Sequence, residues 1–401
     1  MIKVGIVGYG TIGSGVYEVI CTNKEYIKKR AGEEVTVKYI CDLRDFPGDP
    51  AEKLITHDFN DIANDPEVSV VVETMGGLHP AYEFVKKALE NGKSVCSSNK
   101  ELVAAYGAEL LELAKSKNLN FLFEASVGGG IPIIRPLNQA LTSDEVVEIR
   151  GILNGTTNYI LTKMSKEGES FESALKEAQD LGYAERNPEA DVEGFDPCRK
   201  IAILTSLAYG KQVDFEDIHT EGITKISKED ILYAKAMKAA VKLLGSSKLD
   251  GGKVYAQVSP ILVSKDHPLY GVNDVFNAIF LRGGSLGEVM FYGKGAGKLP
   301  TASAVVADVV DAVKHKGTNI VTIWDKEKIA LGDFGDMTNS FFVRVPLSDK
   351  EKARELFDIR REINIPEADG EFAFLTGELK ERDFAEKAEK LNVISRIRTA
   401  F

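Results

Sequence analysis

The sequence predicts an α/β protein built from three parts, and three observations support this fold class. The first 130 residues alternate short apolar runs with amphipathic stretches, the pattern becomes mixed after Gly128-Gly129-Gly130, and the segment 341–401 has a βαββαβ rhythm of its own. A chain of 401 residues is long enough for two or three hydrophobic cores. We therefore expect three domains, at 1–130 with a returning segment at 293–316, at 131–292 and at 330–401.

The strands expected in the first region are rich in Val, Ile and Phe and are bounded by turn residues: Ile2–Val7, Val35–Cys41, Val68–Glu73, Ser94–Ser97 and Phe121–Ala125. Amphipathic helices are expected between them at Pro80–Glu90 and Ala104–Lys115. Strands that are apolar throughout are buried on both faces, which is typical of a parallel sheet covered by helices on each side. The region therefore predicts a doubly wound parallel sheet.

The middle region predicts a mixed α+β domain with an open sheet. Helices are expected near 134–141, 158–166, 171–181, 198–208 and 231–244, and strands near 146–153, 254–263, 274–281 and 288–292. A further helix at Thr301–Lys314 has the length to pack back on the first domain, which is why the returning segment is assigned there.

The last segment predicts a small ferredoxin-like module. Its strands are expected at Phe341–Val345, Glu362–Ile365, Glu371–Thr376 and Val393–Thr399, with helices at Lys350–Ile359 and Glu381–Leu391. It matches an ordinary βαββαβ unit in length and order.

Composition excludes several classes of partner and site. With 50 Lys and Arg against 61 Asp and Glu the formal charge is −11, which argues against nucleic acid or an anionic membrane as the main partner. The apolar run near the N-terminus is too short for a signal peptide or a membrane span, and the cysteines (Cys21, Cys41, Cys96, Cys198) are widely spaced, so we expect free thiols in a cytoplasmic protein. The five histidines lack the spacing of a zinc site.

The stretch Gly8-Tyr9-Gly10-Thr11-Ile12-Gly13 follows the first strand and opens a helix. Gly8 permits the tight turn, Gly10 lets the backbone approach a pyrophosphate, and Gly13 permits close packing of helix and strand. The N–H groups at the helix start, including those of Thr11 and Ile12, would hold the anion. The motif at this place predicts a Rossmann-type site for NAD or NADP.

Two charged residues after the second strand bear on the choice of cofactor. Asp42 ends that strand, where a carboxylate would bind the ribose 2′-hydroxyl of NAD. Arg44 could instead receive the 2′-phosphate of NADP, or both could be solvated loop charges. The preference between NAD and NADP stays open.

Further blocks resemble homoserine dehydrogenase and follow that family's order over roughly residues 1–315: Val71–Gly77, Ser98–Lys100, Phe123–Pro132, Gly151–Ile160, Leu181–Glu185, Asp191–Asp196, Arg199–Lys200, Gly293–Gly297 and Pro300–Val305. The resemblance implies an NAD(P)-dependent enzyme that interconverts L-homoserine and L-aspartate 4-semialdehyde in threonine, methionine and isoleucine biosynthesis. Composition and spacing alone reach only an NAD(P)-linked oxidoreductase.

The resemblance implies that Lys200 transfers the proton of the substrate hydroxyl. Asp196-Pro197 is typical of a helix start, with Asp as the N-cap and Pro at the first position, which places Lys200 in the first turn over Asp196. The helix dipole and burial disfavour the ammonium form whereas Asp196 favours it. Spacing alone favours an ordinary surface ion pair worth ~0.3–0.5 kcal/mol.

The resemblance also implies the groups around the substrate and cofactor. Glu185 binds the substrate, with Asp191 and Asp196 in the same pocket, and Lys100 lies between cofactor and substrate. Thr74 and Gly297 match cofactor-contacting positions, although Lys294 replaces the commoner Pro in the loop before Gly297. Arg186-Asn187 stands where Ala-Asp is more common, which changes the charge beside Glu185.

The family's cation loop and C-terminal module have counterparts here. Glu124, Val127, Gly129 and Ile131 match a loop that holds a sodium ion, mainly through backbone carbonyls, and a plain interdomain hinge is the other reading. The C-terminal module resembles an ACT domain, which receives an amino-acid effector in many such enzymes. Its segment Pro346–Lys352 lacks the usual Gly, so a dimerising or structural role is equally open. A homodimer or higher homo-oligomer, formed through the middle domain, is expected.

Three other functions fit the sequence less well. An aspartate-semialdehyde dehydrogenase needs a reactive cysteine supported by His, and neither Cys96 nor Cys198 has an obvious His partner. A related NAD(P)-linked amino-acid-pathway dehydrogenase would lack the combination of Glu185, Asp191 and Lys200. A catalytically silent NAD-binding sensor would not need Lys200.

Overall fold

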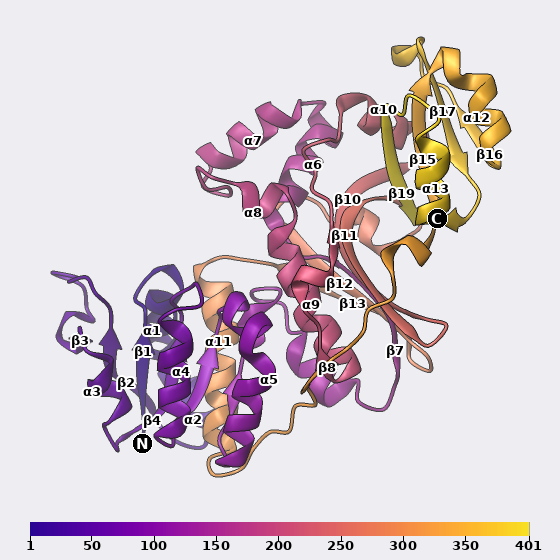
Figure 1. The fold of residues 1–401 in the computed structure, drawn as a ribbon. Helices are drawn as coiled ribbons and strands as arrows, with labels where there is room; N and C mark the ends of the chain where they lie inside the picture. Colours follow the sequence, from indigo (N-terminus) through magenta and orange to yellow (C-terminus); the bar gives the residue numbers. More distant parts are fainter. Residues whose placement is uncertain (401) are drawn as a thin grey trace. The chain divides into compact units, whose positions relative to one another are not determined.

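The computed structural model describes residues 1–400 and divides into two compact units. The first comprises Met1–Glu145, Ala202–Asp214 and Gly293–Ile329, and the second comprises Val146–Ile201, Phe215–Tyr292 and the C-terminal part from Ala330. Figure 1 shows the chain from indigo at the N-terminus to yellow in the C-terminal module.

A six-stranded parallel sheet forms the centre of the first unit, in the order β3 (Ile55–Thr56), β2 (Val35–Cys41), β1 (Ile2–Val7), β4 (Val68–Glu73), β5 (Ser94–Ser97) and β6 (Phe121–Leu122). The expected bounds of β1, β2, β4 and β5 are confirmed. Val7 pairs with Cys41 on one side and with Glu73 on the other. The residues that follow these strands therefore lie at one edge of the sheet.

Helices pack around this sheet: α1 (Thr11–Thr22), α2 (Lys24–Ala31), α3 (Phe59–Ala63), α4 (Ala81–Glu90), α5 (Lys100–Ser116) and α11 (Lys298–Lys314). The expected return of α11 to this unit is confirmed, since Ala302, Val305 and Val309 belong to one core with Val4 and Val16. Figure 1 shows α11, in orange, among the indigo and purple helices. A short two-stranded sheet of β8 (Lys211–Gln212) and β14 (Asp325–Lys328) completes the unit.

Two expected bounds in the first unit were wrong. The strand expected at Phe121–Ala125 ends at Leu122, because the chain turns there into a 3-10 helix at Glu124–Ser126. Helix α5 begins at Lys100 and not at Ala104, because the Asn99 side chain accepts hydrogen bonds from the N–H groups of its first turn and so caps it.

The second unit is built on an 11-stranded sheet. The middle region supplies β13 (Gly287–Lys294), β12 (Phe276–Gly283), β7 (Val146–Ile152), β10 (Ala239–Asp250), β11 (Lys253–Ser264) and the short β9 (His219–Thr220). The helices are α6 (Gly155–Glu167), α7 (Phe171–Asp180), α8 (Glu189–Val192), α10 (Lys228–Ala236) and α9 (Phe195–Tyr209), whose last eight residues are assigned to the first unit.

The expected end of the helix Ile231–Leu244 was wrong. Helix α10 ends at Ala236, Lys238 adopts a φ of 56°, and β10 begins at Ala239. Strand β10 pairs with β11 along its whole length, from Ala239 opposite Ser264 to Asp250 opposite Lys253. The apolar residues of this stretch fit a helix or a strand equally well, so pairing with β11 decides between them.

The C-terminal βαββαβ order is confirmed, with β15 (Thr338–Pro346), α12 (Lys350–Leu356), β16 (Ile359–Ile363), β17 (Glu371–Thr376), α13 (Glu381–Ala388), β19 (Ser395–Ala400) and an additional short β18 (Leu379–Lys380). Strand β16 lies about three residues earlier than expected. The sequence did not predict that β19 pairs in parallel with β11, Ile261 opposite Arg398. The module's strands therefore continue the sheet of the middle region.

No helix within residues 1–400 is both long enough and apolar enough to cross a membrane. The four cysteines are free thiols, as expected.

Candidate active site

The glycine turn, residues Gly8–Gly13, connects β1 to α1 with the geometry that its glycines predict. Gly8 has a φ of 90°, and a Cβ on Gly13 would lie 1.9 Å from the Gly8 carbonyl oxygen. A Cβ on Gly10, in contrast, would meet no protein atom within 4 Å, so packing inside the chain does not require this glycine. Gly10 caps α1 without a side-chain hydrogen bond, which leaves the N–H groups of the first turn to an anion. The residues fit a bound pyrophosphate.

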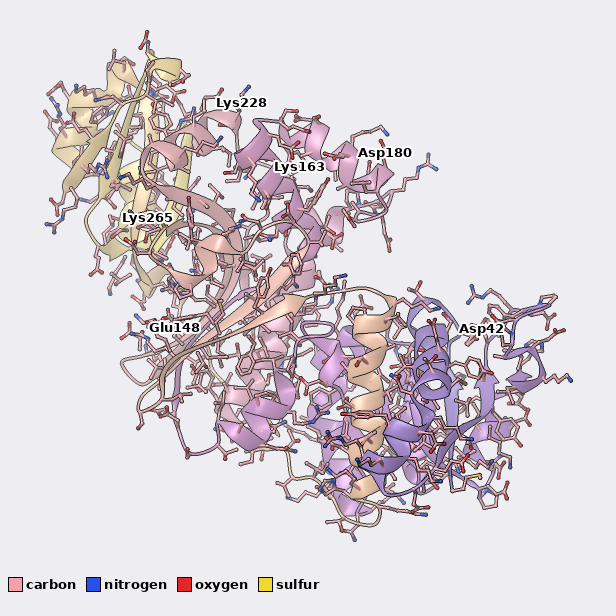
Figure 2. The ribbon with its side chains drawn as sticks, turned by 180° about the vertical axis from the view of Figure 1, so that it is seen from behind. Asp42, Glu148, Lys163, Asp180, Lys228 and Lys265 are labelled. Carbon is pink, nitrogen blue, oxygen red and sulfur yellow. The ribbon has the colours of Figure 1, made fainter. Side chains whose placement is uncertain are left out.

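Asp42 and Arg44 lie beside this turn. The Asp42 carboxylate accepts hydrogen bonds from the Tyr9 N–H at 2.7 Å and from the Arg44 guanidinium at 3.0 Å. These bonds, that of Arg44 above all, lower the pKa of Asp42 to about 2. Asp42 is largely buried whereas the Arg44 side chain is 61% exposed and lies over the Phe46 ring. Figure 2 shows Asp42 on the first unit. The guanidinium is therefore the accessible charge of the pair.

The ends of β4 and β5 are joined by a buried network that the sequence did not predict. The Glu73 carboxylate, fully buried, accepts hydrogen bonds from Ser97 Oγ at 2.5 Å and from the Met75 N–H at 2.8 Å. Burial raises the pKa of Glu73. Asn99, which caps α5, also donates to the Gly77 carbonyl at 2.7 Å. Lys100, the first residue of α5, is thus fixed to both strand ends.

Thr74, which was expected to contact the cofactor, forms hydrogen bonds to the glycine turn. Its hydroxyl donates to the Gly8 carbonyl at 2.9 Å, and its N–H to the Val7 carbonyl. Thr74 therefore fixes the shape of the glycine turn. Gly297, the other expected contact, has a φ of 117° and caps α11.

The Lys200 cluster, made of Asn154, Asp191, Asp196 and Lys200, lies in the second unit. Lys200 Nζ donates to Asp196 Oδ2 and to the Leu153 carbonyl, both at 2.8 Å. Both side chains of this ion pair are mostly buried, 12% exposed for Lys200 and 5% for Asp196. The pair predicted from the i,i+4 spacing is present, and its burial distinguishes it from an ordinary surface pair.

Asn154 joins the two carboxylates of this cluster. Its Nδ2 donates to Asp191 Oδ1 at 2.7 Å and to Asp196 Oδ2 at 2.8 Å. Asn154 lies in the block Gly151–Ile160 that resembles the family, but the resemblance implied no role for this residue. The available signal was an Asn between an expected strand and an expected helix, which is a preferred N-cap residue.

The expected start of α9 needs a correction. Asp196 is not the N-cap, because the helix begins at Phe195 and the Gly194 carbonyl accepts the hydrogen bond from the Cys198 N–H at 3.0 Å. Gly194, with a φ of 85°, makes the tight turn between α8 and α9. Lys200 consequently lies in the second turn, where the helix dipole acts on it less strongly than expected.

Glu185 lies apart from the bonded cluster. Its side chain is exposed, and its carboxylate forms no hydrogen bond with the part of the chain that the structure describes. Its loop is held by the Tyr183 carbonyl, which accepts from Thr156 Oγ1 at 2.6 Å. Lys100 and the glycine turn belong to the first unit, whereas Glu185 and the Lys200 cluster belong to the second.

The loop matched to a cation site is tightly bonded. The Glu124 carboxylate accepts hydrogen bonds from the N–H groups of Ile133, Ile134 and Arg135 at 2.5–2.8 Å. Gly128 and Gly129 both have a positive φ. Among the described residues, no group of three or more His, Cys, Asp or Glu side chains could hold a metal ion. A cation here would depend on backbone carbonyls, because backbone amides already bind the Glu124 carboxylate.

Neither Cys96 nor Cys198 has the surroundings of a nucleophile. Cys96 is fully buried, and Cys198 is buried with its Sγ against the Phe215 carbonyl. Burial raises the pKa of both thiols. Neither has the lowered pKa that a cysteine-dependent aldehyde dehydrogenase requires.

Comparisons with known proteins agree over most of the chain. A family model described as homoserine dehydrogenase matches residues 132–310, and one described as the homoserine dehydrogenase NAD binding domain matches residues 8–124. A homoserine dehydrogenase of Bacillus subtilis (strain 168) is 44% identical over 318 residues, which cover 78% of this chain and 73% of that protein.

Solved structures show the same similarity. The crystal structure of a homoserine dehydrogenase from Thiobacillus denitrificans has a TM-score of 0.92 at 34% identity, covering 100% of this chain and 98% of that one. A hyperthermophilic archaeal homoserine dehydrogenase in complex with NADPH has a TM-score of 0.67 at 31% identity, covering 78% of this chain and 97% of that one.

Proposed function

Because the chain belongs to the homoserine dehydrogenase family, we propose that Lys200 transfers the proton in this reaction and that Glu185 and Asp191 bind the substrate. The activity is the NAD(P)-linked interconversion of L-homoserine and L-aspartate 4-semialdehyde, in the biosynthesis of aspartate-family amino acids. The observation that carries the proposal is the buried ion pair of Lys200 and Asp196.

The reaction needs a group that exchanges a proton with the substrate oxygen. A bound nicotinamide accepts or supplies the hydride. In the oxidising direction the Lys200 amine takes the hydroxyl proton of homoserine, and in the reducing direction its ammonium returns a proton to the aldehyde oxygen. Asp196 and the Leu153 carbonyl support this role because each accepts a hydrogen bond from Nζ and so fixes its direction.

The substrate is an amino acid, so its α-ammonium needs carboxylates and its carboxylate needs a cation. Glu185 and Asp191 would bind the ammonium group, and Lys100 would bind the carboxylate or orient the reacting carbon. Arg186 and Asn187, next to Glu185, are exposed. The positive charge of Arg186 would weaken the attraction between Glu185 and the substrate ammonium group.

The cofactor would be held by the glycine turn, through Gly8, Gly10, Thr11, Ile12 and Gly13, with Thr74 and Gly297 beside it. We propose that Arg44 decides between the two cofactors. Its guanidinium is exposed and can receive a 2′-phosphate, and Asp42 would then be the partner that orients it.

We further propose that the loop of Glu124, Val127, Gly129 and Ile131 holds a sodium ion with a structural role. Gly128 and Gly129 support this, since two successive left-handed residues can turn neighbouring carbonyls toward one point. Glu124 would contribute its carbonyl and not its carboxylate.

We propose three domains at 1–130 with 293–316, 131–292 and 330–401, and a homodimer formed through the middle domain. The C-terminal module would be an ACT-like domain that either binds an amino-acid effector or is structural. Because β19 pairs with β11, removing the module would uncover the edge of β11, so point substitutions test an effector better than truncation.

The test of the proposed function is steady-state turnover of L-homoserine by Lys200→Met, with Lys176→Met as the matched control. Both lysines form an i,i+4 pair with Asp, but Lys176 is 70% exposed on α7. We expect Lys200→Met to lower kcat by about 10²–10⁴-fold, the usual contribution of a general acid–base, with cofactor binding unchanged. Lys176→Met should behave like the wild type. Equal turnover in the two variants would remove the role assigned to Lys200.

A further inference from the structure

The turn Leu153–Thr156, between β7 and α6, bonds to the three segments of the second unit that carry proposed substrate and proton-transfer residues. The Leu153 carbonyl accepts from Lys200 Nζ, Asn154 Nδ2 donates to Asp191 and Asp196, and Thr156 Oγ1 donates to the carbonyl of Tyr183, in the loop of Glu185. These segments are 27 to 47 positions away along the sequence. Asn154 is the residue of this turn that bonds two of them at once.

The orientation of the Asn154 amide follows from its role as the N-cap of α6. Its Oδ1 accepts from the Thr157 N–H at 2.9 Å and from Thr157 Oγ1 at 3.1 Å. Because a backbone N–H can only donate, the oxygen must face the helix. Nδ2 then faces the carboxylates, where both of its hydrogens are used, at 2.7 and 2.8 Å. The amide is 6% exposed, so this arrangement is fixed inside the protein.

The amide also suits the charge of the cluster. Asp196 Oδ2 receives hydrogen bonds from both Lys200 and Asn154, so two donors fix the carboxylate beneath the amine. An amide can hold two carboxylates together without adding a positive charge. The formal charges of Asp191, Asp196 and Lys200 then sum to −1, which suits a substrate that brings an ammonium group.

The element that carries Asn154 is itself held in place. A Cβ on Gly155 would lie 3.0 Å from the Val275 carbonyl oxygen. Asn158 Nδ2 donates to the Asp274 and Phe276 carbonyls at 2.9 and 3.0 Å, which ties the first turn of α6 to the start of β12. A positioning group on a rigid element holds its partners more closely than one on a loop.

We propose that Asn154 is a positioning residue for the reaction: it holds Asp191 toward the substrate ammonium group and Asp196 beneath the Lys200 amine. This inference rests on the proposed function of Lys200 and Asp191. Asn154 acts through these side chains, so its loss is expected to raise KM through Asp191 and to lower kcat through Asp196.

The variants Asn154→Ser and Asn154→Asp distinguish two roles of this residue, the bridge that its amide makes between Asp191 and Asp196 and the N-cap of α6. Ser and Asp are both good N-caps, so α6 keeps its start, but Ser removes the bridging donors and Asp replaces them with a third carboxylate. We expect Asn154→Ser to lower kcat/KM for homoserine by about 10- to 100-fold, because small misplacements of reacting groups have effects of this size. Asn154→Asp should have a still lower kcat/KM, because its carboxylate repels those of Asp191 and Asp196. Binding of NADPH, measured by fluorescence titration, should be unchanged for both.

The control is Ser170→Ala, which removes the N-cap of α7 and its hydrogen bond to the Ser173 N–H. It should lower the melting temperature slightly and leave kcat/KM unchanged. The second readout is a double-mutant cycle with Asp191→Asn, in which effects on KM should be strongly non-additive if Asn154 acts through Asp191. Additive effects, or a kcat/KM of Asn154→Ser equal to that of Ser170→Ala, overturn the inference.

The Lys200→Met experiment separates this inference from the proposed function. A loss of turnover in Lys200→Met together with normal kinetics in both Asn154 variants overturns the positioning role alone. Normal turnover in Lys200→Met overturns the proposed function and the inference with it. If Asn154→Ser is too unstable to assay, Asn154→Asp and its cycle with Asp191→Asn give the same decision.

Discussion

The glycine turn of the first unit and the Lys200 cluster of the second are built in different ways. The turn is a contiguous stretch whose shape depends on the backbone, since Gly8 adopts a positive φ and Gly13 allows the helix to approach the Gly8 carbonyl closely. The cluster brings side chains from three segments together through hydrogen bonds across 37 and 42 positions. A backbone site is thus specified locally, whereas a side-chain site depends on the fold around it.

The Lys200 cluster also depends on distant parts of the chain, and Glu221 shows one such connection. Its carboxylate accepts hydrogen bonds from His219 and from Arg396 and Arg398 of β19. The next residue, Gly222, packs against the backbone of α8, where a Cβ would lie 2.2 Å from the Val192 carbonyl oxygen. Two successive residues, Glu221 and Gly222, therefore contact the C-terminal module and the helix that carries Asp191.

We expect Glu221→Gln to lower the free energy of unfolding by about 3 kcal/mol at pH 7, because it leaves the buried Arg398 with one carboxylate fewer. Burial alone would raise the pKa of Glu221, but hydrogen bonds from His219 and Arg398 outweigh it and lower the pKa well below the ordinary 4.5. A carboxylate with a lowered pKa in the folded state stabilises above its unfolded pKa, and the contribution is lost as the pH falls.

Urea unfolding at several pH values checks this expectation, with Glu327→Gln as the control because Glu327 forms an exposed pair with Lys211. The difference in the free energy of unfolding between Glu221→Gln and the wild type should be constant at neutral pH and should become smaller below pH 4.5. A difference that does not depend on pH would contradict the assignment.

The glycine turn is tested by comparing Gly13→Ala with Gly10→Ala. A methyl group at position 13 meets the Gly8 carbonyl oxygen at 1.9 Å, so we expect a loss of about 1–3 kcal/mol in stability together with weak binding of NADPH. A methyl group at position 10 meets no protein atom, so stability should be kept while binding weakens. Calorimetry and NADPH titration separate the two effects. Normal NADPH binding by Gly10→Ala would show that no phosphate approaches this residue.

The smallest expected effect concerns Arg44. Arg44→Ala should lower kcat/KM for NADP about tenfold, or 1.4 kcal/mol, the size expected for a hydrogen bond to a charged group, and leave that for NAD nearly unchanged. Arg30→Ala is the control, because Arg30 lies over the Tyr26 ring as Arg44 lies over Phe46. An unchanged ratio of the two cofactors would show that Arg44 does not decide between them.

The sequence predicted those features that depend on neighbouring residues. The bounds of four parallel strands, the turn at Gly8 and the i,i+4 pair of Lys200 and Asp196 all follow from local pattern. The bridge made by Asn154 could not be predicted, because its partners lie 37 and 42 positions away and only the fold brings them together.

The same reason explains the errors in the fold. Residues 239–244 have the apolar content of a helix, but they pair with residues 259–264 of β11 and so belong to the strand β10. The pairing of β19 with β11 joins residues more than 130 positions apart. The start of α9 was misplaced because Asp196-Pro197 is a good local start signal, whereas the helix begins directly after Gly194, two residues earlier than that signal requires.

The central claim is that the Lys200 amine exchanges the substrate proton, and rescue of Lys200→Ala by small primary amines tests it most directly. The variant should turn over homoserine very slowly, and added amines should restore turnover to a degree that depends on their pKa, as general acid–base catalysis requires. Turnover of Lys200→Ala close to that of the wild type, or a restored rate that does not depend on the pKa of the amine, would contradict the claim.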